Sequence, residues 1–429
     1  MVNPKRNAAL SLRADHLTTD LVFALIALAA FVVYWLSSFA LVARNGTQHF
    51  HVDAWLYAEL SEPHLFDRIL PETQLARIVR FHPVTVILAA GWMKIVSPFA
   101  AWFTPAQLLK ALFAAAGALG VWASLRAFAT LLPRHYALLW GSVYASSLGI
   151  WYFSSIEESK IVTATLSALY IAAYLRMRTS FSRSAALRLS AILLIACLNE
   201  IVAAFLVAIP AVDTLVRERR EAFKRWWIAA HAMVAVFALL LLEVVMRSWS
   251  SVVGTGAEGA NHFSMLIWYA SYTQFTFNTV YYFLVSWLFF SIAAPERYAY
   301  HWADPSIHFG GIFIPGLANY VGSPLRAALA FLFTVLLAVV IVLRKRMSFL
   351  QNAPAVMLAL ASYAFVRGVF FLVFNPKENM LFSPSVILPH LLLVAMPFAA
   401  STLPERAKIA LLALFAALLF VNNGLFVLG

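Results

Sequence analysis

The sequence predicts an all-α membrane protein, a polytopic transmembrane helical bundle of about 11–13 helices. Two features of its composition lead to this fold class. Hydrophobic residues make up 63% of the 429 residues and charged residues only 12%, whereas soluble domains carry about 25% charged residues. The mean hydropathy is +0.82. A water-soluble protein of this length could not bury so much apolar surface, so lipid must be its solvent.

The spanning segments must be helices because backbone groups find no water to bond in the bilayer core. The sequence lacks the period-two alternation of a membrane β-barrel. Apolar runs fall at about 21–43, 84–103, 107–131, 135–156, 157–175, 187–212, 226–248, 279–294, 325–343, 353–374, 380–400 and 406–428. No repeat or low-complexity linker separates them, so we expect one integral membrane domain over residues 1–429.

Basic residues indicate the orientation of the chain. The net charge is +12, and many of the cations cluster in residues 176–188, 213–225 and 344–346, between apolar runs. This is the positive-inside pattern of cytoplasmic loops, and it argues against nucleic acid as a partner and for contact with membrane lipids. We expect a multi-pass protein of a bacterial inner membrane with a cytoplasmic N-terminus.

The run 187–212 lies between two of these basic clusters, so it should start and end on the same side. We therefore expect a hairpin of two short helices with the polar pair Asn199–Glu200 at its apex. A charged residue in the middle of a spanning helix would otherwise cost roughly 2.5–3.5 kcal/mol.

The topology of the first half contains a conflict of parity. Four apolar runs separate the first external loop from Arg176, but an odd number of crossings is required to reach the cytoplasmic side. One of the runs should therefore not cross fully, and we expect this near Pro98–Pro105. If the run 157–175 ends inside, then Glu157 and Glu158 lie at the outer face.

Long polar loops follow from this topology. Residues 44–82 form the first external loop, in which 53–60 and 73–81 mix apolar and charged residues as amphipathic helices at the membrane surface do. Residues 249–324 form a second external region around the short run 279–294, rich in glycine, proline and aromatic residues.

The first loop contains Asp53-Ala-Trp-Leu-Tyr57, and the next helix begins at a proline after His82. This layout resembles the membrane glycosyltransferases of the GT-C class, notably the lipid A aminoarabinose transferases and the protein O-mannosyltransferases. The short hairpin with a polar break and the acidic pair Glu157–Glu158 also resemble that family. The sequence departs from many relatives at Ala54, where they carry a second acid, and it shows no large soluble domain.

The resemblance implies an enzyme that moves a sugar from a polyprenyl-phosphate donor to an acceptor hydroxyl at the outer, periplasmic face. Such a transfer needs a carboxylate that accepts the hydroxyl proton, and Asp53 is the candidate base. Asp53 could instead cap a helix starting at Ala54. Glu158 is the second catalytic candidate, holding the acceptor or a metal, or else it interacts only with a helix dipole. Tyr57 is expected in the same cavity.

The leaving phosphate requires cations or hydrogen-bond donors, and His82, Arg297 and Lys377 are the candidates. Each could instead extend toward the lipid headgroups. Glu200 and Glu378 are further cavity candidates, and Glu200 could equally make a buried structural hydrogen bond.

A divalent metal is a further alternative, because His49, His51 and Asp53 alternate and would face one way in an extended segment. The acceptor could be a glycan, a lipid or a protein. A transporter or lipid flippase is the main competing function, since a dozen helices with a polar pair in mid-membrane would also suit it; a structural subunit is the third possibility.

Overall fold

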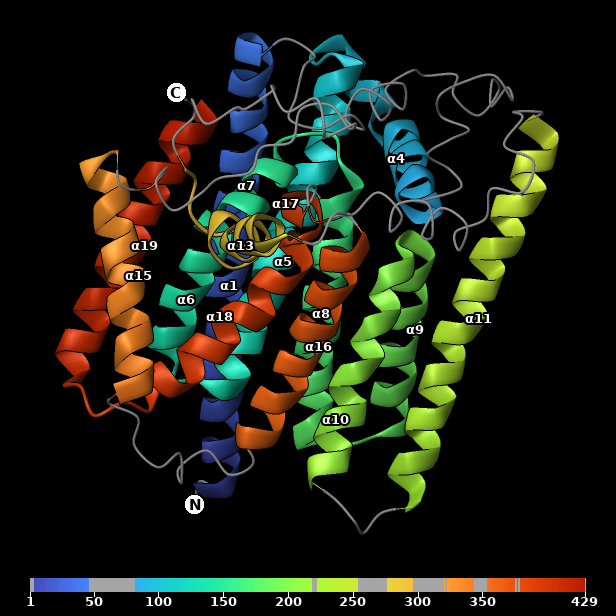
Figure 1. Ribbon diagram of the computed structural model, residues 1–429. Coiled ribbons are helices and arrows are strands. Elements are labelled where there is room, and N and C mark those ends of the chain that lie inside the picture. The colour runs from blue at the N-terminus through green and yellow to red at the C-terminus, as the bar shows by residue number, and fades with distance from the viewer. Residues whose placement is uncertain are drawn as a thin grey trace.

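The computed structural model describes residues 4–45, 82–217, 222–253, 276–295, 320, 322–342, 353–374, 376 and 379–428. Within these ranges the chain forms helices and turns without a β-strand, which confirms the all-α prediction. Most of the helices lie side by side and run along a common direction (Figure 1). The loop residues 46–81, with the predicted surface helices, lie outside the described residues.

The helices in chain order are α1 (Pro4–Asn45), α4 (Pro83–Val96), α5 (Pro105–Leu131), α6 (Arg134–Ser146), α7 (Leu148–Ser154), α8 (Ser159–Thr179), α9 (Arg183–Asn199), α10 (Ala208–Arg217), α11 (Ala222–Val253), α13 (Phe277–Val285), α15 (Pro324–Val342), α16 (Ala353–Phe374), α17 (Asn379–Phe382), α18 (Pro384–Ala399) and α19 (Glu405–Leu428). Three shorter elements join them: η3 (Ser97–Ala101), η4 (Ile201–Val207) and η5 (Ser286–Phe290).

The chain is an integral, multi-pass membrane protein. Among the described residues, seven helices are long and apolar enough to cross a bilayer. The first of them shows why its sequence suits this place: Leu21, Leu25 and Leu28 are more than half exposed, whereas Phe23 and Tyr34 are buried. This spacing places one apolar face of α1 toward lipid and the other against the bundle.

Helix α5 lies at the centre of the bundle, packed against α1 and α8. It also packs against α7, where a Cβ atom at Gly117 would lie 1.9 Å from Ser154 Oγ. A Cβ atom at Gly120 would lie 3.0 Å from Thr165 Oγ1, and that hydroxyl donates to the Ala116 carbonyl at 2.6 Å. Small residues let membrane helices approach in this way.

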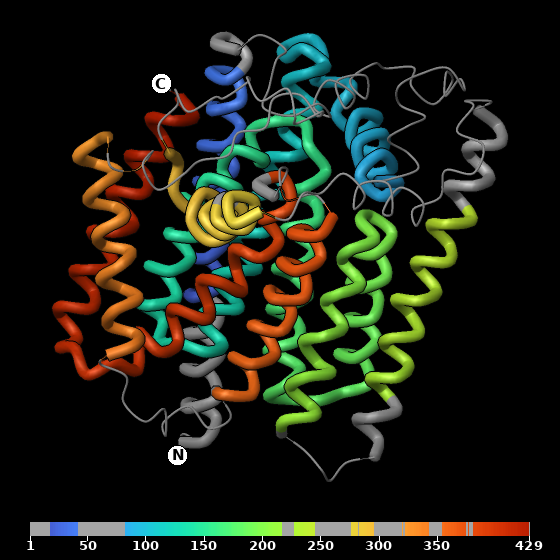
Figure 2. The backbone as a smooth tube through the Cα atoms, in the orientation of Figure 1, coloured from blue at the N-terminus to red at the C-terminus, as the bar shows by residue number. Residues whose placement is uncertain are grey.

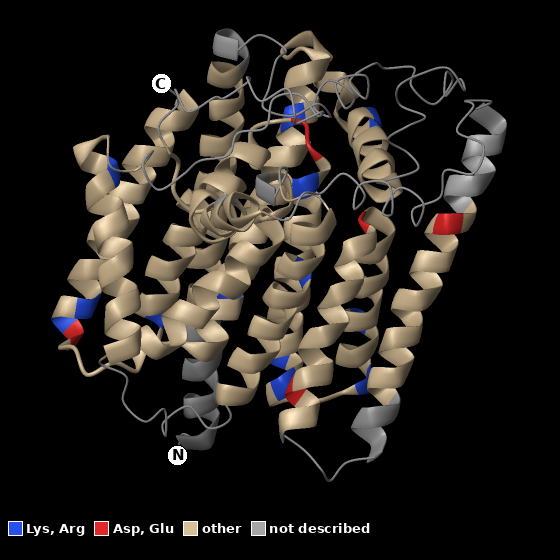
Figure 3. Ribbon diagram, in the orientation of Figure 1, with Lys and Arg blue, Asp and Glu red and all other residues tan. Residues whose placement is uncertain are grey.

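The bundle has two chemically different ends, which Figure 3 shows at the bottom and the top of the view. The end that holds the N-terminus also holds the arginine-rich end of α8 and the start of α9, and we name it the basic end. The opposite end holds the end of α1, the start of α5 and the start of α8, and we name it the far end. Glu157 and Glu158 directly precede α8 and so lie at the far end, as the topology predicts.

The predicted hairpin is confirmed. Helix α9 ascends from the basic end, and η4 and α10 descend beside it (Figure 2). The break is at Glu200, whose backbone is extended with φ −153° and ψ 121°. The polar pair therefore lies at the apex of the hairpin, facing the far end.

The parity conflict has a structural explanation. In Figure 2, α4 lies wholly in the upper half of the molecule, near the tops of α9 and α11. The chain then turns through η3 into α5, which descends to the basic end, and a hydrogen bond from Trp92 Nε1 to the Leu108 carbonyl at 2.7 Å joins α4 to α5. Helices α5, α6 with α7, and α8 then make three passes, an odd number.

A buried asparagine on α19 holds two broken helices together at the far end. Asn423 Nδ2 donates to the carbonyls of Ser146 at 2.6 Å and Ile292 at 2.7 Å, and its Oδ1 accepts from the Ala294 backbone at 2.8 Å. The backbone groups freed by the α6–α7 junction and by the end of η5 are thus satisfied without water.

Candidate functional site

Six charged side chains are buried at the far end of the bundle, none of them more than 5% exposed. We name them the far-end charge cluster; they are Lys110, Glu157, Glu158, Lys160, Glu200 and Arg367. Burying a charge is costly unless it is paired, and ionisable groups inside a membrane bundle mark functional sites. The cluster is therefore the candidate site.

The first ion pair of the cluster joins α5 to the link before α8. Helix α7 ends at Ser154, and the chain continues to Glu157, whose Oε1 lies 3.7 Å from Lys110 Nζ. Burial raises the pKa of Glu157 above its ordinary value, and the positive charge of Lys110 opposes this rise. The pair makes Glu157 a carboxylate with a buried counter-ion rather than a solvated loop residue.

Glu158 occupies the N-cap position of α8 with extended backbone, φ −145° and ψ 129°, but its side chain makes no capping hydrogen bond. Its Oε1 accepts instead from Ser159 Oγ at 3.1 Å. The side chain is fully buried. Simple helix capping therefore does not account for this carboxylate.

Glu200 carries the second part of the cluster, at the apex of the hairpin. Its Oε1 lies 3.4 Å from Arg367 Nη2 and 3.8 Å from Lys160 Nζ. Glu200 is therefore the shared counter-ion of two buried cations.

One of the two cations that face Glu200 keeps unused hydrogen-bonding capacity. Arg367 is fully buried, and its Nε and Nη1 have no hydrogen-bond partner among the described residues. The same holds for Oε2 of Glu200. Buried polar groups are normally satisfied, so these atoms call for a polar partner that is not among the described residues.

Aromatic rings support both cations from α16 and α17. Lys160 Nζ lies 4.5 Å from the ring centroid of Phe382, and Arg367 Cζ lies 5.2 Å from that of Phe371. The two rings are themselves stacked at 4.1 Å. Cation–π contacts of this kind stabilise a desolvated cation without neutralising its charge.

Asn199 connects three segments beside Glu200. Its Oδ1 accepts from the Thr85 backbone at 3.0 Å and from Thr85 Oγ1 at 2.7 Å, and its Nδ2 donates to Thr163 Oγ1 at 2.9 Å. His82 Nδ1 lies 2.8 Å from the Asn199 carbonyl. A carbonyl only accepts, so this nitrogen carries the proton, and the ring is fixed at the start of α4.

Three of the residues predicted from the sequence are described, and all three lie at the far end. His82 and Glu200 are brought together through Asn199, and Glu158 lies two residues before Lys160, which pairs with Glu200. The other predicted site residues lie outside the described residues; they are Asp53, Tyr57, Arg297, Lys377 and Glu378.

The sequence interpretation missed the three cations of the cluster. Lys110 and Arg367 are isolated charges inside the apolar runs 107–131 and 353–374, and Lys160 lies two residues after the acidic pair, in the run 157–175. An ionisable residue within a spanning run is a signal of function in itself, and applied to each run it would have singled out all three.

The described residues contain no group of three or more histidine, cysteine or acidic side chains placed to hold a metal. His49, His51 and Asp53, which the sequence suggested as metal ligands, lie outside the described residues.

Comparison with known proteins supports the fold. No protein-family model and no curated protein matches the chain. Among solved structures, ArnT from Cupriavidus metallidurans bound to undecaprenyl phosphate matches with a TM-score of 0.53 and 12% identity, over 95% of this chain and 76% of that one. The fold is GT-C-like. ArnT in the apo state also matches, with a TM-score of 0.41 and 15% identity, over 89% of this chain and 77% of that one.

The GT-C-like fold confirms the architecture that the resemblance implies, namely a helical membrane bundle with a short hairpin at Asn199–Glu200. At 12% identity the similarity concerns the fold alone. What the site does must therefore be inferred from its own residues.

Proposed function

We propose that this protein is a glycosyltransferase that moves a sugar from a polyprenyl-phosphate donor to an acceptor hydroxyl. The far end would be the periplasmic side of a bacterial inner membrane, because the arginine-rich loops lie at the other end. The observation that carries the proposal is the far-end charge cluster, in which buried carboxylates lie beside buried cations and one of these, Arg367, has unused donors. The solved GT-C structure of similar fold has undecaprenyl phosphate bound.

The reaction requires one bond to form and one to break. The acceptor oxygen attacks the anomeric carbon, the bond from that carbon to the phosphate oxygen breaks, and the polyprenyl phosphate leaves with the bonding electrons. A carboxylate takes the acceptor's proton as the new bond forms. We assign this proton to Asp53 in the first external loop and the positioning of the acceptor to Glu158.

The leaving phosphate gains negative charge, which must be met by donors already in place. The free Nε–H and Nη1–H groups of Arg367 and the ammonium of Lys160 provide such donors at the far end. They add to His82, Arg297 and Lys377, which we retain as phosphate-binding candidates. Glu200 would hold Lys160 and Arg367 in position when no substrate is bound.

A transporter or flippase remains the alternative, and the distribution of carboxylates favours the enzyme. Glu157, Glu158 and Glu200 all lie at the far end, at the start of α8 or at the hairpin apex. A transporter binds its substrate near the midplane, where both sides have alternating access. Transfer from a lipid phosphate needs its charges at one membrane face instead.

Purified full-length protein in lipid nanodiscs provides the test. We expect it to bind undecaprenyl phosphate and to release that lipid from a panel of undecaprenyl-phosphate-linked sugars when lipid A or glycan acceptors are added. Asp53→Asn and Glu158→Gln should lower product formation by about 100-fold or more while lipid binding persists. Glu405→Gln is the matched control, because Glu405 is half-exposed and pairs with His135 far from the cluster.

Two outcomes would contradict the proposal. The first is full product formation by both Asp53→Asn and Glu158→Gln. The second is transbilayer movement of the lipid-linked sugar in proteoliposomes without any covalent product, which would favour the flippase.

A further inference from the structure

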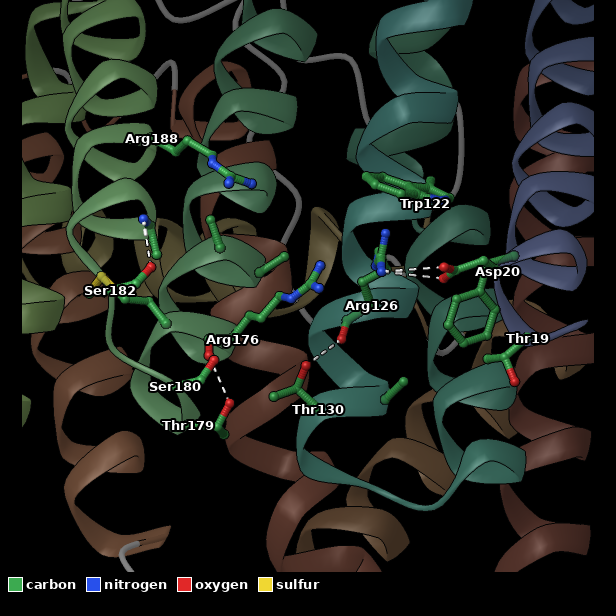
Figure 4. A pocket seen from close by; sticks show the side chains of 16 residues that line it. Thr19, Asp20, Trp122, Arg126, Thr130, Arg176, Thr179, Ser180, Ser182 and Arg188 are labelled. Carbon is green, nitrogen blue, oxygen red and sulfur yellow. Dashed lines mark hydrogen bonds and ion pairs between the residues drawn. The ribbon is translucent and has the colours of Figure 1, made fainter. Parts of the chain in front are cut away.

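A cleft of about 590 Å³ opens between α1, α5, α8 and α9 in the half of the bundle nearer the basic end (Figure 4). It is separate from the far-end charge cluster, since none of that cluster's residues lines it. Its charged lining consists of Asp20, Arg126, Arg176 and Arg188. Figure 4 shows the guanidinium groups of Arg176 and Arg188 extending from α8 and α9 toward α5.

The charges of the cleft do not balance. Arg126 Nη2 lies 3.4 Å from Asp20 Oδ1, and its guanidinium also lies 4.7 Å from the ring centroid of Trp122. Among the described residues, no carboxylate pairs with Arg176 or Arg188, and Arg188 donates only to Ser184 Oγ at 2.9 Å. Three arginines and one aspartate leave a net charge of +2 in one cleft.

The helices that form the cleft also carry apolar side chains. Phe23 and Met177 line its walls. Leu21 on α1 is 59% exposed and Leu187 on α9 is 72% exposed, and each is next in sequence to a charged lining residue. A ligand that enters here meets guanidinium groups at one part and hydrocarbon at another, as a lipid with a charged headgroup requires.

We propose that this cleft binds the phosphate of an anionic membrane lipid in the leaflet at the basic end. Planar guanidinium groups match phosphate oxygens in a two-pronged hydrogen-bonding geometry. Arg176 and Arg188 grip the phosphate, and Arg126 is held in place by Asp20 and Trp122. The site lies at the opposite end from the proposed transfer chemistry and does not depend on it.

Arg183 is the control residue that distinguishes a specific site from general attraction between basic loops and lipid headgroups. Like Arg176 and Arg188 it is exposed, and it lies in the first turn of α9 at the basic end, but it does not line the cleft. If the attraction were nonspecific, Arg176, Arg183 and Arg188 would contribute similarly to lipid binding. A specific site would instead depend on Arg176 and Arg188, which line the cleft.

The experiment is a lipid titration of the delipidated full-length protein followed by native mass spectrometry. We expect one saturable copy of phosphatidylglycerol, with phosphatidylcholine bound much more weakly. The double variant Arg176→Gln/Arg188→Gln should lower the affinity for phosphatidylglycerol by about 30-fold, and Arg183→Gln should leave it within about twofold. A thermal unfolding profile of each variant verifies that it is folded.

Three results would overturn the inference. Equal binding of the two lipids by the unaltered protein would remove any preference for an anionic headgroup, whatever the variants do. Equal losses for Arg183→Gln and for Arg176→Gln would indicate nonspecific attraction. Displacement of the bound lipid by millimolar inorganic phosphate would identify a soluble phosphate, rather than a lipid, as the ligand.

Discussion

Lys160 Nζ lies 3.8 Å from Glu200 Oε1, and this ion pair joins the first turn of α8 to the break at the apex of the helical hairpin. Arg367 on α16 reaches the same carboxylate oxygen at 3.4 Å, across 167 residues of sequence. Because Glu158 lies two residues before Lys160, the position of the candidate acceptor-binding carboxylate depends on this shared contact. Glu200 therefore belongs both to the packing of the bundle and to the proposed site.

Glu200→Gln should destabilise the protein by roughly 3–5 kcal/mol, because it leaves two buried cations without their counter-ion. Replacing Arg367 by methionine in the same chain removes one of those cations, so the double variant Glu200→Gln/Arg367→Met should recover part of the loss. Unfolding in mixed detergent micelles measures both effects. If the double variant loses the sum of the two single losses, Glu200 and Arg367 are not energetically coupled.

Much of the fold follows from charge and apolar pattern. Basic clusters on both sides of residues 187–212 predict the hairpin and its apex at Asn199–Glu200, because a buried carboxylate is tolerated only at a break or beside counter-ions. In the structure Glu200 has both. Local sequence was sufficient here, since the physical constraint is itself local.

Other features depend on contacts that no local pattern contains. Helix α4 with η3 is long and apolar enough to cross a membrane, yet it lies in one half of the bundle (Figure 1). The sequence could not predict this, because the hydropathy of a segment does not determine how deep the segment lies in the membrane. Similarly, the place of Arg367 inside an apolar run signals a functional charge, but its partner is not local: only the packing of α16 near the hairpin apex brings it to Glu200.

Asn423→Leu should lower the free energy of unfolding by on the order of 3 kcal/mol, since it removes the side-chain partners of the buried Ser146 carbonyl and Ala294 N–H. The Ile292 carbonyl would lose one of its two donors and keep the Leu148 N–H. Asn423→Asp keeps the acceptor for Ala294 but loses both donors, so it should still destabilise. Leu414→Ala on the same helix is the control, because Leu414 is 50% exposed on the apolar surface. Thermal unfolding in detergent distinguishes them; equal losses for Asn423→Leu and Leu414→Ala would contradict the structural role.

Asp213 should be the most sensitive carboxylate at the basic end. It is 2% exposed, and its two oxygens lie 2.8 Å and 3.2 Å from Nε and Nη2 of Arg178, while the hydroxyl of Tyr174 also donates to it. This two-pronged pair joins α8 to α10 and so fixes one arm of the hairpin against the bundle. Asp213→Ala leaves a largely buried guanidinium without its counter-ion and should cost roughly 3–5 kcal/mol.

Asp20→Ala provides the matched comparison at the same end. The side chains of Asp20 and its partner Arg126 are 47% and 30% exposed and 3.4 Å apart, so this pair should contribute no more than about 1 kcal/mol. Guanidine titrations of both variants in micelles, read by tryptophan fluorescence, give the two free energies. Because the two pairs share charge type and membrane side, a smaller loss for Asp213→Ala than for Asp20→Ala would show that burial and two-pronged geometry do not determine the strength of ion pairs in this bundle.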